Sequence, residues 1–390
     1  MFFITFALII TVYLSLSVVY PLPVGWPWKT AFVLLIFICV GRYAILRSIF
    51  GGLGGIETNK YLLYFTSFLQ DLFIFLFLIA VLRDIICILS LPSYFLPGLS
   101  EGGILFRKAL KGIGFTIALV SLAGLVSLWA LYEAAKVPTV KRTEVTLDRL
   151  PPALDGLKIA ILADLHICRF FDRPWVEEVV RRTNELDPDL ILIPGDLVDG
   201  EVKLRAEDVE PLARLKSRYG KFFSVGNHEY YSQLPSWIPA FQGLGLQNLY
   251  NLSVPVNLRG TTLYLAGVTD PAAYGYDLPG PDLKEALKGV PASGHPLILL
   301  DHRPHNALEN AKDGRVSLQL SGHTHGGLFP ILATLTKRAN RGYLRGWYEV
   351  NGLKLYVHPG TALWSGVPAR IFNPSEITLL TLHSPKPEPK

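Results

Sequence analysis

Two patterns of apolar and polar positions divide the chain. Over its first 135 residues, apolar side chains form four long stretches, at residues 2–20, 30–46, 61–82 and 113–132. Beyond residue 154, apolar residues instead occur in short runs that alternate with polar segments. Long stretches are typical of helices that cross lipid, and short runs are typical of strands buried in a sheet.

The amino-terminal part is predicted to be a membrane domain, at residues 1–135. Each long stretch approaches or exceeds the roughly 20 residues needed to cross a bilayer as a helix. We therefore expect about four transmembrane helices, a multi-pass protein of the cell membrane, and the lipid bilayer as a partner. Trp26 and Trp28 lie between the first two stretches, where aromatic side chains at the membrane surface are expected. With four spans, five lysines and arginines flank the membrane on each side, so the positive-inside rule leaves the orientation open.

The remaining chain is predicted to hold a linker at 136–154, a catalytic domain at 155–384 and a tail at 385–390. Strand patterns at 158–163, 190–193 and 222–225 alternate with helix patterns at 174–186 and 207–218. Such βαβ units predict a parallel sheet segment covered by helices.

Later runs predict β-hairpins. The pair Asn351-Gly352 separates runs at 347–350 and 353–357, and Arg259-Gly260 separates runs at 254–258 and 261–268. An Asn-Gly pair between apolar runs is a strong hairpin signal.

Polar clusters directly follow five of the short apolar runs, which lie at 159–162, 190–193, 222–225, 297–300 and 316–320. The clusters are Asp164 with His166, Asp196 with Asp199, Asn227 with His228 and Glu229, Asp301 with His302, and His323 with His325. Residues just past strand ends at one edge of a sheet converge in space. Carboxylates, imidazoles and an amide oxygen gathered at one edge suit a pair of divalent cations.

Together, the motifs Asp-Leu-His, Gly-Asp-Leu-Val-Asp, Gly-Asn-His-Glu and Gly-His-Thr-His resemble those of the calcineurin-like metallophosphoesterases. The resemblance covers about residues 155–384, including an opening at 154–159 and a closing run at 368–377, and it does not cover the first 140 residues. It implies an α/β catalytic domain built as an αββα two-sheet sandwich. Joined to the multi-pass α-helical membrane domain, this is the expected fold class.

The resemblance also implies two metal sites that share Asp196 as a bridging ligand. The ligands that complete the first site would be Asp164, His166 and His325. Those that complete the second would be Asn227, His302 and His323. This mixture of oxygen and imidazole ligands suits Mn²⁺, Fe or Zn²⁺ better than Mg²⁺ or Ca²⁺, and the sequence does not say which metals are bound. A bridging hydroxide between the two ions is expected to attack phosphorus in line.

Three neighbouring residues are expected to assist without binding metal. His228 is the expected catalytic residue, acting on the leaving oxygen as a general acid or charge stabiliser. Asp199 is expected to fix the site from behind the ligands. Glu229 either orients the His228 ring or is a solvated acid at a helix start. His305, three residues beyond His302, is an alternative to it as the metal ligand.

The surroundings of the site suggest a substrate class without identifying substrate-binding residues. An apolar segment at 328–335 follows the last histidine motif, and basic residues follow it. With Tyr230, Tyr231 and Trp237, this segment could form an apolar, basic-rimmed mouth that faces lipid. The alternative is that residues 328–335 pack into the core.

Composition narrows the functional classes only slightly. The formal net charge of +5 is modest, and the basic residues are scattered, so no nucleic-acid partner is expected. Three cysteines (Cys39, Cys87 and Cys168) are too few for a disulfide framework. The oligomeric state stays open.

We therefore expect a membrane-tethered, dinuclear metal-dependent phosphohydrolase that cleaves a phosphoester or pyrophosphate. A lipid-linked substrate, such as a phospholipid or a UDP-diacylglucosamine, is favoured because tethering raises the local concentration of lipids. The alternative is a membrane-anchored phosphodiesterase for a soluble nucleotide or cell-wall substrate. A third hypothesis is a transporter or receptor with a regulatory metal domain, since Arg42, Asp71, Arg83 and Asp84 lie in or beside the apolar stretches.

Overall fold

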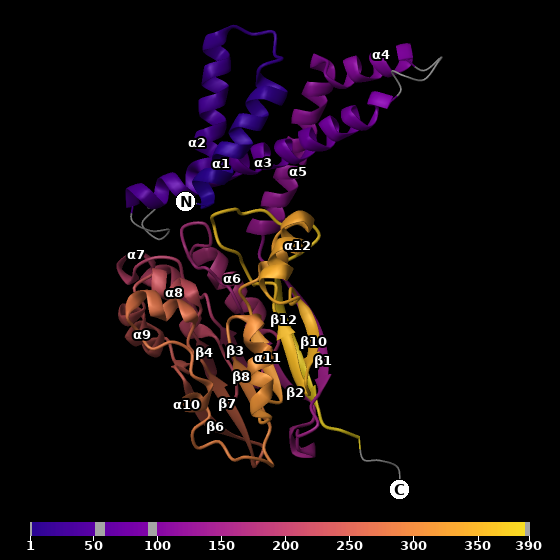
Figure 1. Cartoon of the computed structure of the whole chain (residues 1–390). Helices are drawn as coiled ribbons and strands as arrows, with labels where there is room; N and C mark the ends of the chain where they lie inside the picture. Colours follow the sequence, from indigo (N-terminus) through magenta and orange to yellow (C-terminus); the bar gives the residue numbers. More distant parts are fainter. Residues whose placement is uncertain (1, 51–58, 93–99, 387–390) are drawn as a thin grey trace. The chain divides into compact units, whose positions relative to one another are not determined.

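The computed structural model describes residues 2–50, 59–92 and 100–386 (Figure 1). The chain forms two compact units. One contains the apolar helices up to Tyr132, and the other contains nearly all of the residues from Glu133 onward. Each unit is described by itself below.

Most of the described residues of the first unit are helical. Its helices are α1 (Phe2–Leu14), which continues as the π-helix η1 (Ser15–Val19), α2 (Trp26–Phe50), α3 (Lys60–Leu89), α4 (Ser100–Leu110) and α5 (Ile113–Ala135). Within the described residues, three segments are long and apolar enough to cross a membrane: Trp26–Ile49, Lys60–Leu89 and Ile113–Ala135. The first apolar stretch forms a shorter helix, Phe3–Val19, so the number of four crossings stays a prediction. Trp26 and Trp28 lie in the first turn of α2, not in a connecting loop.

Arg42, Arg83 and Asp84 have polar partners within the unit. Arg42 of α2 donates to Thr66 of α3 over 3.0 Å, and Arg83 pairs with Asp84 at 2.8 Å. Pairing of this kind reduces the cost of holding charge in an apolar surrounding, so these three residues do not by themselves require a transport function. Asp71 differs: it is buried on α3, and neither of its side-chain oxygens has a hydrogen-bond partner among the described residues.

The described part of the second unit is built around two six-stranded sheets, in the orders β1-β12-β2-β3-β4-β5 and β10-β11-β9-β8-β7-β6. The strands of the first sheet are β1 (Thr139–Thr146), β2 (Leu157–Ile161), β3 (Leu190–Pro194), β4 (Lys221–Ser224), β5 (Leu246–Asn248) and β12 (Glu376–His383). Those of the second are β6 (Leu252–Leu258), β7 (Thr261–Gly267), β8 (Leu297–Leu300), β9 (Leu318–Ser321), β10 (Gly346–Val350) and β11 (Leu353–Val357). Both predicted hairpins, β6–β7 and β10–β11, are present and antiparallel.

The main core lies between the two sheets. Side chains such as Ile159 and Leu192 of the first sheet join Leu265, Ile298 and Leu320 of the second in one buried cluster. A second cluster joins the other side of the second sheet to α10 (Leu283–Ala286) and α11 (Ala307–Asn310). Helix α6 (Arg173–Asn184) follows β2 and buries its apolar face. The architecture confirms the predicted two-sheet sandwich with flanking helices (Figure 1).

The structure differs from the sequence prediction at β1, which lies inside the segment predicted as a linker. It pairs in parallel with β12 from Thr139↔Glu376 to Thr146↔His383. None of its residues is buried, because it is an edge strand with polar side chains. An edge strand of this kind lacks the apolar run that marks a buried strand, so its pairing was missed.

The second predicted helix, at 207–218, also differs. The chain forms α7 (Val202–Val209) followed by a 3-10 turn, η5 (Glu210–Arg214). Pro211 occupies the start of that turn. Proline lacks the backbone N–H that a continuing α-helix needs, which explains the change in helix type.

Candidate metal centre

The candidate site forms where loops leave the carboxyl ends of strands in both sheets. Strands β2, β3 and β4 are parallel neighbours in one sheet (Figure 1). In the other sheet, β8 and β9 are parallel neighbours. Their following loops bring three groups of side chains together, with the ligand atoms of each group within 4.8 Å of one another. The groups are Asp164 with His166 and His325, His166 with Asp196 and His228, and Asp196 with His302 and His323.

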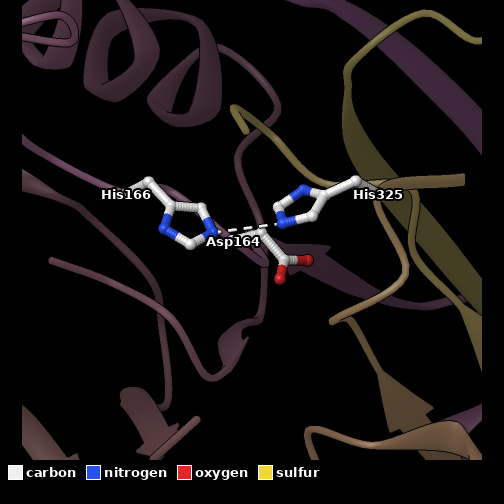
Figure 2. A group of neighbouring side chains, drawn as sticks. All are labelled: Asp164, His166 and His325. Atoms are coloured by element: carbon white, nitrogen blue, oxygen red, sulfur yellow. Dashed lines mark hydrogen bonds between the residues drawn. The ribbon is translucent and has the colours of Figure 1, made fainter. Parts of the chain in front are cut away.

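The first group has two imidazoles facing one another beside a carboxylate (Figure 2). The Nε2 atoms of His166 and His325 are 3.3 Å apart. Asp164 accepts a hydrogen bond from the His323 backbone N–H over 2.9 Å through Oδ1. Its other oxygen is buried and has no hydrogen-bond partner among the described residues. A cation placed between the two ring nitrogens and this oxygen would satisfy all three atoms.

Asp196 lies where the groups meet. Its Oδ2 atom is 3.1 Å from Nε2 of His302 and 3.6 Å from Nε2 of His166. Its Oδ1 atom accepts from the His228 backbone N–H over 2.8 Å. A carboxylate between imidazoles of two groups has the position of a bridging ligand.

The His302 ring is held in one orientation by the backbone. Its Nδ1 atom is 2.9 Å from the Pro194 carbonyl oxygen. Because a carbonyl can only accept, Nδ1 carries a proton, and Nε2 is the ring nitrogen left to bind a cation. This is the tautomer that a metal-binding histidine needs.

Some of the buried polar atoms without hydrogen-bond partners lie in this site. Among the described residues, they include Asp164 Oδ2 and Asn227 Oδ1. Each unsatisfied buried polar group costs about 1–3 kcal/mol. Their convergence fits cation binding, because cations would supply the missing partner for each lone pair. The residues present therefore fit the divalent ions that the motifs predict.

The protonation states also suit metal binding. Burial, together with His302 for His323 and His166 for His325, holds the pKa of both rings well below the ordinary value. Burial opposes ionisation of Asp196, but His302 and His228 outweigh it and hold the pKa of that carboxyl well below its usual range. Metal ligation requires neutral imidazoles and ionised carboxylates, the state that these shifts favour for His323, His325 and Asp196. Two ligands shift the other way: burial lowers the pKa of His302 but Asp196 outweighs it and raises that pKa to about 10, and burial raises the pKa of Asp164 to about 6. Positive charge from bound cations would lower both pKa values.

Backbone strain is concentrated in the same loops. Asp164, His166, Asp196, His323 and His325 have φ angles of 53°, 42°, 53°, 70° and 47°. Non-glycine residues seldom adopt this left-handed region, and each costs on the order of 1–3 kcal/mol. Five strained residues that all belong to one polar cluster favour a functional reason for the conformation.

The glycines of the motifs have a specific steric role. A Cβ atom on Gly226 would lie 2.2 Å from Oδ1 of Asp196, and one on Gly322 would lie 2.4 Å from Oδ2 of Asp164. Both positions must therefore lack a side chain, because the carboxylates occupy that space.

His228 is held by Asp199. Nδ1 of His228 is 2.5 Å from Oδ1 of Asp199, and the same oxygen is 3.2 Å from Nδ1 of His166. Burial lowers the pKa of His228, but Asp199 and Asp196 outweigh it and raise that pKa to about 9. Positive charge from bound cations would act in the opposite direction. Asp199 thus contacts two rings of the site, and its supporting role stays a prediction.

Glu229 neither orients the His228 ring nor lies in solvent, the two alternatives expected for it. Its side chain is buried, so it is not a solvated acid. Its carboxylate accepts from the backbone N–H groups of Asp196, Leu197 and Gly226 at 3.0, 2.6 and 2.7 Å. It therefore fixes the loop that carries Asp196, and Asp199 is the acid bonded to the His228 ring.

The expected apolar mouth is only partly formed. Tyr230 and Trp237 are buried, and Trp237 donates to the Gly200 carbonyl over 2.9 Å, so neither lines an exposed surface. Tyr231 is 51% exposed, and its ring centroid lies 5.2 Å from that of His228. His305 lies outside the three groups of described residues, so the geometry favours His302 over it.

Residues 328–335 were expected either to form an exposed apolar mouth or to pack into the core, and each alternative holds for part of the segment. Leu328 and Phe329 are buried. The next residues form α12 (Pro330–Ala339), on which no residue is buried and Ile331 and Leu335 are 55% and 56% exposed. The segment is therefore core at its start and surface afterwards.

The backbone of His325 is supported by two side chains that the sequence did not indicate. The Arg370 side chain is fully buried and donates to the carbonyl oxygens of His325 and Ala362 over 3.2 and 2.7 Å. Asn373 Nδ2 also donates to the His325 carbonyl, over 2.5 Å. Both residues lie in the closing run at 368–377, but nothing in that run indicates which loop it would support.

Comparison with known proteins places these motifs in a family. Residues 157–327 match the family described as calcineurin-like phosphoesterase. The chain is 35% identical over 278 residues to a Danio rerio protein named transmembrane protein with metallophosphoesterase domain, an alignment that covers 68% of this chain and 62% of that protein. A Bos taurus protein of the same name is 37% identical over 279 residues, with the same coverage. The chain thus spans about three fifths of the length of these two relatives.

A bacterial relative is matched over more of its length. The chain is 36% identical over 282 residues to a Helicobacter pylori protein named uncharacterized metallophosphoesterase. The alignment covers 71% of this chain and 72% of that protein.

Proposed function

Because this chain belongs to the calcineurin-like metallophosphoesterase family, we propose that it is a metal-dependent hydrolase of a phosphoester or pyrophosphate. The observation that carries the proposal is the convergence of unsatisfied, buried ligand atoms around Asp196. A structural cluster would be expected to pair these atoms with one another, whereas a metal site must leave them free.

We assign the ligands as the sequence predicts. Asp196 is shared between two cations. The residues that complete the first cation's site are Asp164, His166 and His325. Those that complete the second are Asn227, His302 and His323. The three geometric groups support this division, except that Asn227 is included for its orphaned side-chain oxygen.

The chemistry divides between the cations and the side chains. When bound, two divalent cations acidify a water molecule and neutralise charge on the phosphoryl oxygens. His228 donates a proton to the leaving oxygen as the bond between phosphorus and that oxygen breaks and the bond to the water oxygen forms. Asp199 holds the His228 ring through Nδ1, which leaves Nε2 for the leaving group. Glu229 holds the loop of Asp196 in place.

We further propose that the substrate is lipid-linked. Helix α12 follows the His325 loop closely and presents Ile331 and Leu335 to solvent, with Lys337 and Arg338 in its last turn. Exposed apolar residues beside basic ones are typical of helices that lie on an anionic membrane surface. The long apolar helices of the first unit support a multi-pass location, with residues 1–135 as the membrane domain. A soluble nucleotide or cell-wall phosphodiester is the alternative substrate.

The proposal is tested by joining metal analysis to a panel of phosphoesters. The full-length protein, purified in detergent, is expected to contain divalent metal and to hydrolyse at least one phosphoester. Asp196→Asn should lose bound metal and reduce turnover at least about a hundredfold, because metal-ligand geometry fails at the shared position. Asp313→Asn is the matched control, since Asp313 is an acid paired with Arg315 in an ion pair outside the metal-ligand groups. Full turnover in Asp196→Asn would overturn the bridging assignment.

A further inference from the structure

Arg303 directly follows His302, and its guanidinium forms a bidentate pair with the Asp270 carboxylate, here called the fork. Its Nε and Nη2 atoms donate to the two Asp270 oxygens over 2.7 and 2.9 Å. Asp270 is itself fixed, because its side chain also accepts from the Ala272 backbone N–H over 2.8 Å. The Arg303 backbone N–H donates to Asp301, which adds a second anchor. The guanidinium plane is therefore set before any ligand arrives.

The fork uses two of the three nitrogens of the Arg303 guanidinium. None of the hydrogen bonds found among the described residues uses its Nη1 atom, and its side chain is 22% exposed. The Asp270 side chain, by contrast, is fully buried. One side of the guanidinium thus faces the protein, and the other can be reached from solvent.

Arg303 lies beside the metal candidates in the chain, because it follows His302 directly. An arginine side chain is cationic at neutral pH. Arg303 can therefore offer positive charge next to the candidate ligands.

The other arginine that acts on the site cannot contact a substrate. Arg370 is fully buried, and its Nη1 and Nη2 atoms donate to backbone carbonyls at 3.2 Å or less. Its donors are used to hold the loops around His325. Arg303 differs because its donors are only partly used and its side chain reaches the surface.

We propose that Arg303 forms an anion subsite that binds a non-bridging oxygen of the substrate's phosphoryl group, beside the metal centre. The assignment rests on the proposed hydrolase function, and it adds a specificity residue where the sequence indicated none. A planar guanidinium matches the oxygens of a phosphoryl group, and a fork fixed in advance by Asp270 reduces the entropy lost on binding. Its charge also offsets the negative charge that grows on those oxygens during hydrolysis.

The test measures anion binding separately from turnover. Full-length protein loaded with Mn²⁺ is titrated with inorganic phosphate by calorimetry, and KM and kcat are measured with a short-chain phosphodiester. Arg303→Lys keeps the charge but loses the fork, and it is expected to weaken phosphate binding about tenfold to a hundredfold with unchanged metal content. KM should rise by a similar factor.

A closely matched control is present in the chain. Arg315 forms the same fork with Asp313, through Nε and Nη2 at 2.7 and 2.8 Å, and its side chain is 23% exposed. Arg315→Lys removes an equivalent Arg–Asp fork outside the candidate site. It should leave phosphate affinity and KM unchanged.

The outcomes separate the subsite from a structural fork. Unchanged phosphate affinity in a metal-loaded Arg303→Lys protein would overturn the subsite, whether or not its thermal stability falls. If that variant does not fold, modification of the wild-type protein by phenylglyoxal decides the question: phosphate should protect Arg303 and not Arg315, and equal labelling would overturn the subsite. If the wild-type protein hydrolyses no phosphoester, the proposed function fails, while the phosphate titration still decides whether Arg303 binds the anion.

Discussion

A substitution of His228 should lower turnover without changing metal binding. It follows Asn227 directly, and its ring is held by Asp199. We expect His228→Ala to keep its metal and to lower kcat about 10²- to 10⁴-fold, the usual contribution of a positioned acid. Steady-state kinetics joined to elemental analysis of the same samples measures both quantities.

The control for His228 is His305, which lies outside the three ligand groups of the described residues. His305→Ala should change neither metal content nor kcat. Loss of metal in His228→Ala would contradict the assignment, and it would make His228 a ligand beside His166 and Asp196.

His358 predicts a pH dependence of stability that is separate from catalysis. It is fully buried, Nδ1 accepts from the Gly360 backbone N–H over 3.0 Å, and burial lowers its pKa to about 4. The ordinary histidine pKa is about 6.5, so between pH 6.5 and 4 the unfolded state binds more protons than the folded state. This contribution to the free energy of unfolding is complete above about pH 6.5 and is lost as the pH falls to about 4.

The free energy of unfolding should change by on the order of 3 kcal/mol for a pKa shift of this size. Thermal unfolding of wild type and His358→Gln at pH 7 and pH 5 measures it. The wild-type Tm should fall more steeply than the variant's between these two values. Parallel pH dependence in the two proteins would show that His358 titrates normally.

At the scale of elements, the turn from β4 into α8 (Asn227–Tyr231) depends on Gly226. An alanine Cβ at this position would lie 2.2 Å from Asp196 Oδ1, so Gly226→Ala must displace either the carboxylate or the turn. We expect it to reduce metal content and to lower kcat at least about tenfold, since small displacements of a ligand disturb metal geometry. Gly243→Ala, at the end of α9 (Leu234–Gly243), is the control because a Cβ there meets nothing within 4 Å. Metal content equal to wild type in Gly226→Ala would refute the steric argument.

Helix α12 is the element that should distinguish lipid from soluble substrates. Replacing both Ile331 and Leu335 by aspartate removes two exposed apolar side chains, each worth about 1.5–3 kcal/mol when buried in an apolar surrounding. Hydrolysis of a long-chain phosphodiester presented in anionic vesicles should fall at least about tenfold, while a short-chain ester should be cleaved at the wild-type rate.

Leu308→Asp on α11 is the matched control for α12, since Leu308 is another exposed leucine, at 42%. It should leave both rates unchanged. An equal loss on vesicle and short-chain substrates in the α12 variant would instead favour a structural role for this helix and remove the main support for a lipid-linked substrate.

At the scale of the whole molecule, the position of β1 decides where the second unit can be cut. A fragment that starts at Val137 keeps β1 and its pairing with β12, whereas one that starts at Leu147 exposes the edge of β12. We expect the first fragment to fold and to cleave a short-chain ester at a rate within a fewfold of wild type. The second should have a lower Tm and aggregate more readily, because an uncovered strand edge is open to pairing with other chains. Equal Tm values would show that β1 contributes little to stability.

The sequence alone located the buried strands and the polar clusters that follow them, and the resemblance of those motifs to the calcineurin-like metallophosphoesterases implied the two-sheet sandwich. Buried strands appear in the sequence as short apolar runs, and each candidate ligand lies within a few residues of such a run. The signal for the strands and the signal for the ligands are therefore both local. The structure confirms the fold and brings these side chains together, while their roles as ligands stay predictions. The number of membrane crossings also stays a prediction, because apolar length alone does not separate a short helix from a spanning one.

Only the tertiary structure decided how the site is supported. The contact of Asp199 with two rings, the binding of Glu229 to the backbone of the preceding loop, and the support of His325 by Arg370 join residues 29 to 45 positions apart. The edge pairing of β1 with β12 spans a still longer separation. Polar side chains can satisfy themselves with many partners, and the chain's local pattern does not indicate which one the fold will bring near, so such contacts follow only from three-dimensional packing.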